Sequence, residues 1–187
     1  MKQIKETLDE ISNNFIKLTD QSTTNIQEAS KLIIKCLKDS KKIMFCGNGG
    51  SAADAQHLST ELVGRYMKNR KPLASIALTT DTSAITAISN DFSFDEIFSR
   101  QIKAIGNNGD VLYAISTSSK SKNIIAALQA AKNLNIRTIG VTGADHSGFK
   151  DLCDTIISVP ASRPDRIQEM HIAIGHIICE ILETELC

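Results

Sequence analysis

The stretch CGNGGSAADAQH, residues 46–57, places a glycine-rich turn directly after an apolar run and directly before a helical pattern that reaches His57. A strand, a glycine turn and a helix in this order are typical of a βαβ unit whose turn binds a phosphate. The residues around this turn therefore indicate both the fold and the class of ligand.

The sequence contains five short apolar runs, of which the run before the turn is the first. They are apolar without alternation, as in strands that are buried on both faces of a parallel sheet. The runs are KKIMFCG (41–47), LASIALTT (73–80), DVLYAIST (110–117), RTIGVTG (137–143) and TIISVP (155–160). Helical patterns separate or follow them at about residues 51–66, 94–105, 121–134, 147–152 and 164–185. This order predicts an α/β protein, a three-layer α/β/α sandwich around a five-stranded parallel sheet.

Residues 1–40 carry two amphipathic segments ahead of the first strand. Apolar residues recur at helical spacing in each segment. They are Ile4, Leu8, Ile11, Phe15 and Leu18 in the first, and Ile26, Ala29, Ile33 and Leu37 in the second. We expect a pair of helices over residues 1–40 that packs on the sheet or against another subunit. Residues 41–187 then hold the sheet and its covering helices, within a single domain of residues 1–187.

The composition limits the partners and the compartment. Lys plus Arg and Asp plus Glu number 21 each, so the chain has no basic field for nucleic acid or an anionic membrane. We expect a small molecule or another protein as partner. The five cysteines form no CxxC pair, which suits a reducing compartment. The stretch MKQIKETLDEISNN is too polar for a signal peptide, and no apolar run approaches the ~20 residues of a membrane span, so we expect a cytoplasmic protein.

Glycine and hydroxyl residues follow the predicted strands. Ligands of open α/β sheets bind beyond the carboxyl ends of the strands, where GNGGS (47–51) and STSSKS (116–121) are found. Free N–H groups at the start of a helix, together with serine hydroxyls, suit a phosphate monoester. The alternative for the second loop is a helix cap by Ser118 or Ser119. A cap leaves most of the hydroxyls in this loop unexplained.

A dinucleotide is a rival ligand for the glycine turn. Gly47, Gly49 and Ala52 fit the G-x-G-x-x-A form of the dinucleotide fingerprint, and Asp81 could bind a ribose hydroxyl. However, Asp81 lies more than thirty positions after Gly47, and a second phosphate-type loop is present. An NAD-linked enzyme is therefore the weaker interpretation.

Two helical patterns carry potential metal ligands. The first holds a polar stripe at spacings of three and four, made of Asp54, His57, Glu61 and Arg65. His57 and Glu61 lie one turn apart and offer a nitrogen and an oxygen suited to zinc. In the last helical pattern, Gln168 and His176 lie two turns apart and face the same way, whereas His171 points to another side. Spacing alone leaves a solvated face and a metal site both open.

Four motifs together resemble the phosphoheptose isomerases of the sugar isomerase (SIS) family. They are CGNGGSAADAQH (46–57), ALTTDTSAITAISND (77–91), ISTSSKSKNI (115–124) and DRIQEMHIAIGHIICE (165–180). The resemblance implies a flavodoxin-like SIS fold and the conversion of sedoheptulose 7-phosphate into D-glycero-D-manno-heptose 7-phosphate through an enediol. This reaction starts the synthesis of ADP- or GDP-heptose for lipopolysaccharide or surface glycans. The resemblance also implies one Zn²⁺ per subunit and a cytoplasmic homotetramer.

Site residues follow from the resemblance position by position. The implied zinc ligands are His57, Glu61, Gln168 and His176. The implied substrate contacts are Asn48, Gly49, Gly50, Ser51, Glu61, Asn90, Asp91, Ser116, Thr117, Ser118, Ser121 and Gln168. Glu61 is the implied catalytic base and His176 its catalytic partner. Zinc would either polarise the carbonyl group or position these side chains, and the sequence leaves both roles open.

One departure and one alternative remain. Ser119 stands where the family usually has glycine, and we expect the loop to avoid a positive φ so that the serine is harmless. The same family includes a non-catalytic scaffold that associates with the replication initiator, and a sugar-phosphate-sensing module is a further alternative. Neither needs Glu61 and His176, and the presence of both residues favours the enzyme.

Overall fold

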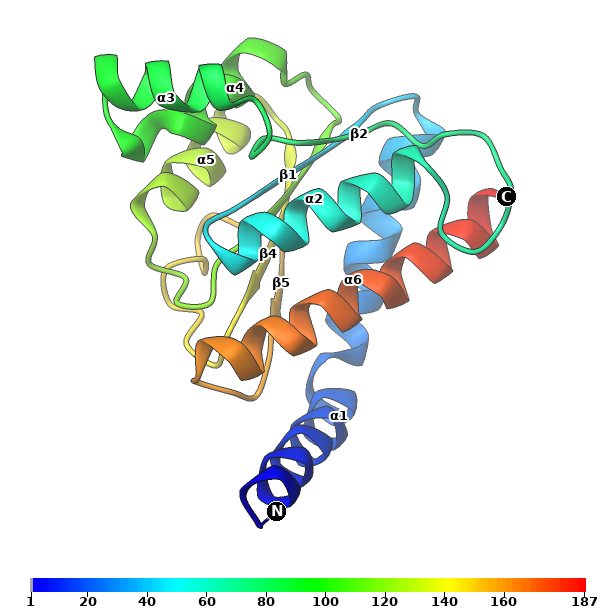
Figure 1. Ribbon diagram of the computed structural model, residues 1–187. Helices are drawn as coiled ribbons and strands as arrows, with labels where there is room; N and C mark the ends of the chain where they lie inside the picture. Colours follow the sequence, from blue (N-terminus) through cyan, green and yellow to red (C-terminus); the bar gives the residue numbers. More distant parts are fainter. Residues whose placement is uncertain (1) are drawn as a thin grey trace.

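Five parallel strands form the central sheet of the computed structural model, which describes residues 2–187 (Figure 1). The strands are β1 (Ile43–Gly47), β2 (Ser75–Ala77), β3 (Val111–Ile115), β4 (Arg137–Thr142) and β5 (Thr155–Ser158). Their order in the sheet is β2-β1-β3-β4-β5, and every neighbouring pair is parallel. Each predicted apolar run contains one strand, so the predicted fold class is confirmed.

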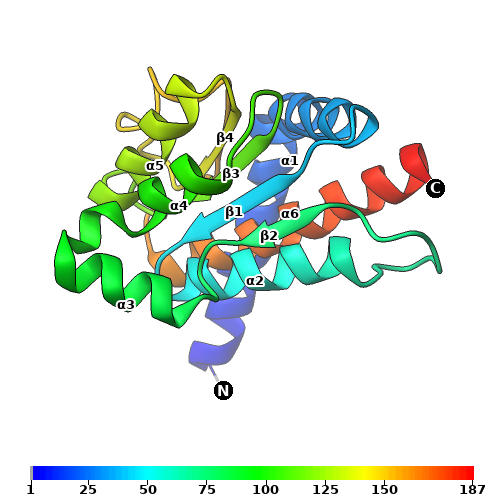
Figure 2. The ribbon, with the colours of Figure 1, turned by 90° about the horizontal axis from the view of Figure 1, so that it is seen from above.

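Helices cover both faces of the sheet (Figures 1 and 2). They are α1 (Lys2–Lys38), α2 (Gly50–Val63), α3 (Thr82–Asp91), α4 (Ile97–Ile105), α5 (Lys122–Asn133) and α6 (Pro164–Leu186), with a short 3₁₀ helix at Phe94–Glu96. Successive strand residues point to opposite faces. Phe45 and Tyr113 pack under α1, α2 and α6, whereas Met44 and Leu112 pack under α4 and α5. Burial on both sides explains why the strand sequences show no polar alternation.

The strand order reverses between β1 and β3, which makes this point the topological switch of the sheet. Gly47 at the end of β1 pairs in register with Ile115 at the end of β3. The loops that follow these strands therefore begin side by side. This is the position at which open α/β sheets bind their ligands.

The prediction of two helices over residues 1–40 is wrong: residues 2–38 form one continuous helix, α1, of 37 residues. Ser22 lies between the two apolar segments and continues their stripe. Its hydroxyl group donates a hydrogen bond of 2.8 Å to the carbonyl oxygen of Ser158, and Asn25 donates one of 2.8 Å to that of Ile156. These polar contacts hold the middle of α1 against β5. The N-terminal half of α1 projects beyond the sheet (Figure 1).

Two smaller elements also differ from the sequence prediction. Residues 147–152 form turns instead of a helix, while α3 was not predicted. Asp81 caps α3, because its carboxylate accepts a hydrogen bond of 2.9 Å from the N–H group of Ala84. This cap gives Asp81 a structural role in place of a ribose contact.

Among the helices of residues 2–187, none combines the length and apolar character needed to cross a membrane.

Candidate active site

The loop after β1 turns directly into α2. Gly49 has a φ of 54°, a left-handed conformation that a side chain would strain. Asn48 exchanges two hydrogen bonds of 2.9 and 2.8 Å with Asn123 at the start of α5. The predicted substrate residue Asn48 thus joins the beginnings of the two helices at the switch point. Ser51 is buried in the first turn of α2.

The loop after β3 leads into α5. The hydroxyl groups of Ser116 and Ser121 lie 3.3 Å apart, and Ser118 accepts a hydrogen bond of 3.2 Å from the N–H group of Lys120. Ser121 precedes α5 without making a side-chain cap. Ser118 and Ser119 accept from the N–H groups of Lys120 and Gly148, which lie outside α5, so a cap by either serine is not observed. A helix start without a side-chain cap suits an anion.

Ser119 has a φ of 55°, so the prediction that this loop avoids a positive φ is wrong. The residue is fully buried, and its hydroxyl group accepts a hydrogen bond of 3.3 Å from the N–H group of Gly148. The Ser119 side chain therefore links this loop to Gly148. Its hydrogen bond offsets part of the free-energy cost of the left-handed backbone.

We expect Ser119→Gly to leave the free energy of unfolding within about 0.5 kcal/mol of the wild type. The lost hydrogen bond and the relieved left-handed strain are each worth about 1 kcal/mol and offset one another. Ser119→Ala keeps the strain and loses the bond, so it should be about 1 kcal/mol less stable. Urea denaturation of both variants checks this, and an alanine variant as stable as the glycine variant would contradict it.

Three of the four predicted zinc ligands converge at the surface between α2 and α6. Nε2 of His57 lies 3.2 Å from Oε1 of Glu61 and 3.2 Å from Nε2 of His176. All three donor atoms lie within 4.8 Å of one another. The helices are packed so that Gly175 contacts Leu58, which places His176 beside His57. The sequence alone could not show that these two helices pair.

The donor set and its spacing fit zinc. Tetrahedral bonds of about 2.1 Å place ligand atoms about 3.4 Å apart, close to the distances from His57 to Glu61 and His176. Two imidazoles and one carboxylate are also the ligand set of many catalytic zinc sites, which keep a fourth position for substrate or water. His57, Glu61 and His176 can therefore hold the ion without rearrangement of the helices.

Gln168, the fourth predicted ligand, lies against the start of α2. Its amide contacts the backbone of Gly50, where a Cβ atom would come within 2.5 Å of Nε2. Gly50 is thus a glycine because the Gln168 side chain crosses it. Gln168 thus lies beside the glycine turn, and His57 lies two turns further along α2. The role of Gln168 as a zinc ligand stays a prediction.

Asp54 lies on α2, one turn before His57, and is partly buried. Its Oδ2 atom is buried and has no hydrogen-bond partner among the residues described. Burial raises the pKa of this carboxyl group to about 6, and the neighbouring His57 opposes the shift. The ionised group is therefore poorly compensated at neutral pH.

We expect Asp54→Asn to stabilise the chain at neutral pH by about 1 kcal/mol, a reduced figure because water screens part of the carboxyl group. The folded chain binds the proton of Asp54 more tightly than the unfolded chain does. The contribution of Asp54 to stability should therefore fall as the pH rises from about 4 to about 6. The gain in Asp54→Asn should be present at pH 7.5 and absent at pH 4, as measured by urea unfolding. A gain of equal size at both values would contradict it.

Four other residues considered in the sequence analysis lie outside the cluster of His57, Glu61 and His176. Asn90 and Asp91 end α3, where the amide of Asn90 donates to the carboxylate of Asp91 at 2.9 Å. Arg65 lies beyond the end of α2 and is exposed, so it extends no helical stripe. His171 is buried, and burial lowers its pKa to about 4. The prediction that His171 points away from the other ligands is confirmed.

Two residues near the site were missed from the sequence. Asn123 holds Asn48, and Tyr66 stacks on His176 with ring centroids 5.8 Å apart. Tyr66 lies in an irregular loop, where no periodicity relates it to α6. Only the three-dimensional arrangement reveals the contact.

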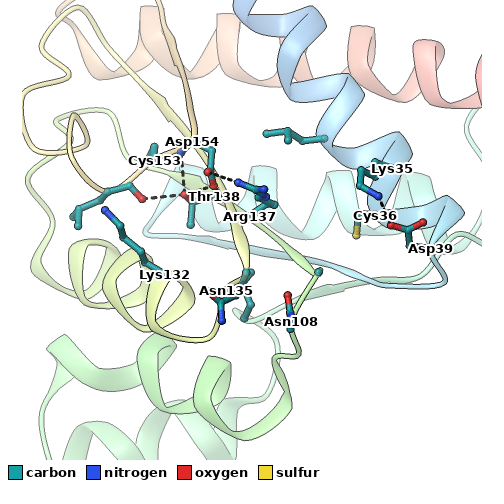
Figure 3. Close-up of a pocket in the computed structure, with 14 residues that line it drawn as sticks. Lys35, Cys36, Asp39, Asn108, Lys132, Asn135, Arg137, Thr138, Cys153 and Asp154 are labelled. Atoms are coloured by element: carbon teal, nitrogen blue, oxygen red, sulfur yellow. Dashed lines mark hydrogen bonds and ion pairs between the residues drawn. The ribbon is translucent and has the colours of Figure 1, made fainter.

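A cavity of about 580 Å³ lies at the opposite edge of the sheet, between the end of α1 and the start of β4 (Figure 3). Its charged side chains are already engaged. Lys35 pairs with Asp39 at 2.7 Å and Arg137 with Asp154 at 2.9 Å, while Lys132 donates to a backbone carbonyl oxygen at 2.7 Å. No candidate ligand of the predicted site lines this cavity.

Comparison with known proteins identifies the family of the chain. The family model described as SIS domain matches residues 7–143. A phosphoheptose isomerase from a Nitratiruptor species is 49% identical, with 98% of each chain covered. The solved phosphoheptose isomerase from Neisseria gonorrhoeae is 40% identical, covers 98% of each chain and has a TM-score of 0.92. That from Francisella tularensis is 33% identical over 98% of this chain and 97% of its own, with a TM-score of 0.94. The chain belongs to the phosphoheptose isomerases, within the SIS domain family.

Proposed function

We propose that this chain is an aldose–ketose isomerase that converts sedoheptulose 7-phosphate into D-glycero-D-manno-heptose 7-phosphate, with Glu61 and His176 as its acid–base pair. The product would begin the route to nucleotide-activated heptose for lipopolysaccharide or other surface glycans. The observation that carries the proposal is the convergence of His57 and Glu61, on the helix that begins at the phosphate-type loop, with His176 of α6. A scaffold or a sensing module has no need of such a cluster.

The length of α2 suits this substrate. His57 lies seven residues after Gly50, a rise of about 10 Å along the helix. A sugar whose phosphate is several carbons away from its reacting carbon spans a distance of the same order. The loops after β1 and β3 would hold the phosphate, while the reacting carbons C1 and C2 lie toward Glu61.

The chemistry requires two proton movements. Glu61 removes a proton from C1, which is acidified by the adjacent C2 carbonyl group, and the resulting enediol receives a proton at C2. His176 moves the proton between the two oxygen atoms, because an imidazole can both donate and accept. Returning the proton to C2 restores Glu61 for the next turnover.

One zinc ion per subunit would be held by His57, Glu61 and His176, with Gln168 as the predicted fourth ligand. When bound, zinc would stabilise negative charge on the substrate oxygens and fix their positions. His57 contacts both Glu61 and His176, which holds the three groups in one cluster.

We further propose a homotetramer in the cytoplasm. The projecting half of α1 leaves Ile4, Leu8 and Ile16 between 59% and 65% exposed, an apolar stripe that another copy could cover. Met67 and Ile177, next in sequence to Tyr66 and His176, are also exposed. Subunit contacts there would place the active sites near the boundaries. The free state of all five cysteines suits a reducing compartment.

We expect a chain that lacks residues 2–17 to remain folded, because the buried part of α1 begins at Leu18. It should sediment as a smaller species than the full-length chain and lose most of its activity with the subunit boundaries. Analytical ultracentrifugation and a turnover assay check both effects. A fully active monomer would show that the boundary contributes nothing to the site.

The reaction itself is tested by incubating the purified, zinc-loaded chain with sedoheptulose 7-phosphate and following the aldose by NMR. Formation of the heptose 7-phosphate supports the proposal. Absence of turnover in the loaded protein would favour the scaffold alternative.

A further inference from the structure

The carboxylate of Glu183 holds the loop that follows α2. Glu183 lies near the end of α6 and is 2% exposed. It accepts hydrogen bonds from the N–H groups of Tyr66, Met67 and Lys68, at 3.1, 3.0 and 2.9 Å. Burial opposes ionisation, but these donors and Arg70 hold the pKa of Glu183 below its ordinary value. A charged side chain in the interior therefore fixes three consecutive residues of an otherwise irregular loop.

Arg70 connects the same carboxylate to the end of α2. Its Nε atom donates to Glu183 at 2.9 Å, and both side chains are 3% exposed. Its two other nitrogens donate to the backbone carbonyl oxygens of Glu61 and Leu62, at 2.7 and 2.8 Å. Carbonyl groups in the last turn of a helix have no partner within the helix. The Arg70–Glu183 pair thus ties together the helices that carry Glu61 and His176.

The loop held in this way presents Tyr66 to His176. The two rings stack, with centroids 5.8 Å apart and planes inclined by 25°. His176 also meets the ring of His57 edge-on, with centroids 5.0 Å apart. The imidazole of His176 therefore contacts two rings, and its Nε2 atom lies 3.2 Å from that of His57. The isomerisation chemistry makes no direct use of Tyr66.

We propose that Tyr66 is a positioning residue, held by Glu183 and Arg70, which fixes the imidazole of His176 in the orientation used for metal binding and proton transfer. The inference rests on the proposed role of His176. A partly exposed histidine otherwise samples several rotamers, and each misplaced orientation removes Nε2 from the cluster. The flat face of an aromatic ring excludes these alternatives, whereas a branched aliphatic side chain does not.

The test compares Tyr66→Leu with Tyr66→Phe, using Asn69→Ala as a control on the same loop. We expect Tyr66→Leu to lower kcat about tenfold, with KM within about threefold, because the phosphate loops are untouched. Its affinity for Zn²⁺, measured by competition with a chromophoric chelator, should fall about tenfold. Tyr66→Phe should restore both values to within about threefold of the wild type, because it keeps the ring. Asn69→Ala should match the wild type.

Glu183→Gln provides a second arm, since it removes the charge that holds the loop while the Tyr66 side chain itself is unchanged. It should lower kcat and zinc affinity in the same direction as Tyr66→Leu. If this variant does not fold, the Tyr66 pair decides alone. The proposal is overturned if Tyr66→Leu keeps wild-type zinc affinity and kcat, or if Tyr66→Phe is as defective as Tyr66→Leu. A wild-type chain that neither binds zinc nor isomerises would instead overturn the proposed function.

Discussion

Glu61→Gln should lower kcat at least 100-fold, within the range typical for removal of a general base. Glutamine keeps the shape of the side chain and its place beside His57, but it cannot accept the C1 proton. KM should change by less than about tenfold, because the loops after β1 and β3 would bind the substrate phosphate through other groups. Steady-state kinetics with sedoheptulose 7-phosphate give both values.

A matched control separates the loss of the base from the loss of one negative charge. Glu185→Gln makes the same chemical change at an exposed position on α6, outside the cluster. It should keep wild-type kinetics. Near-normal turnover by Glu61→Gln would show that Glu61 is not the base, and would direct attention to another group near C1.

The double variant Ser116→Ala with Ser118→Ala should raise KM at least tenfold, while kcat stays within about threefold. Phosphate contacts persist from the ground state to the transition state, so their loss weakens binding and leaves the chemical step intact. A tenfold change corresponds to about 1.4 kcal/mol, a modest estimate for two hydrogen bonds to a charged group.

Thr184→Ala is a suitable control for this pair. Its hydroxyl group is bonded within α6, to the carbonyl oxygen of Glu180 at 2.9 Å, and lies far along the helix from the phosphate loops. Its KM should equal that of the wild type. A double serine variant that loses kcat at constant KM would indicate that these hydroxyl groups serve the chemical step instead.

The sheet was predictable because strands that are buried on both faces have continuously apolar sequences. All five strands lie within continuous apolar runs, and two loops that follow them carry the glycine and hydroxyl residues. The N-terminal helix was divided wrongly because Ser22 and Asn25 look like a break. In the structure these side chains continue the buried stripe by bonding to carbonyl groups of β5. A polar residue whose partner lies more than a hundred positions away gives no local signal.

The site shows the same limit. The spacing of His57 and Glu61 follows from one helix, and the pairing of that helix with α6 came from the resemblance instead of from periodicity. The φ of Ser119 and the stacking of Tyr66 on His176 depend on contacts with distant segments, at Gly148 and Glu183. Such contacts are set by tertiary packing, which neither composition nor spacing records.

The most direct measurement of the central claim follows hydrogen at C1 and C2 in D₂O. The zinc-loaded wild type is incubated with sedoheptulose 7-phosphate, and ¹H NMR records the aldose and its isotopic content, alongside Glu61→Gln. An enediol formed by a solvent-exchanging base predicts deuterium at C2 of the heptose 7-phosphate, with the rate at least 100-fold slower in Glu61→Gln. The result that would contradict proton abstraction by Glu61 is an aldose without deuterium at C2, whose hydrogen there was transferred from C1, formed equally fast by both proteins.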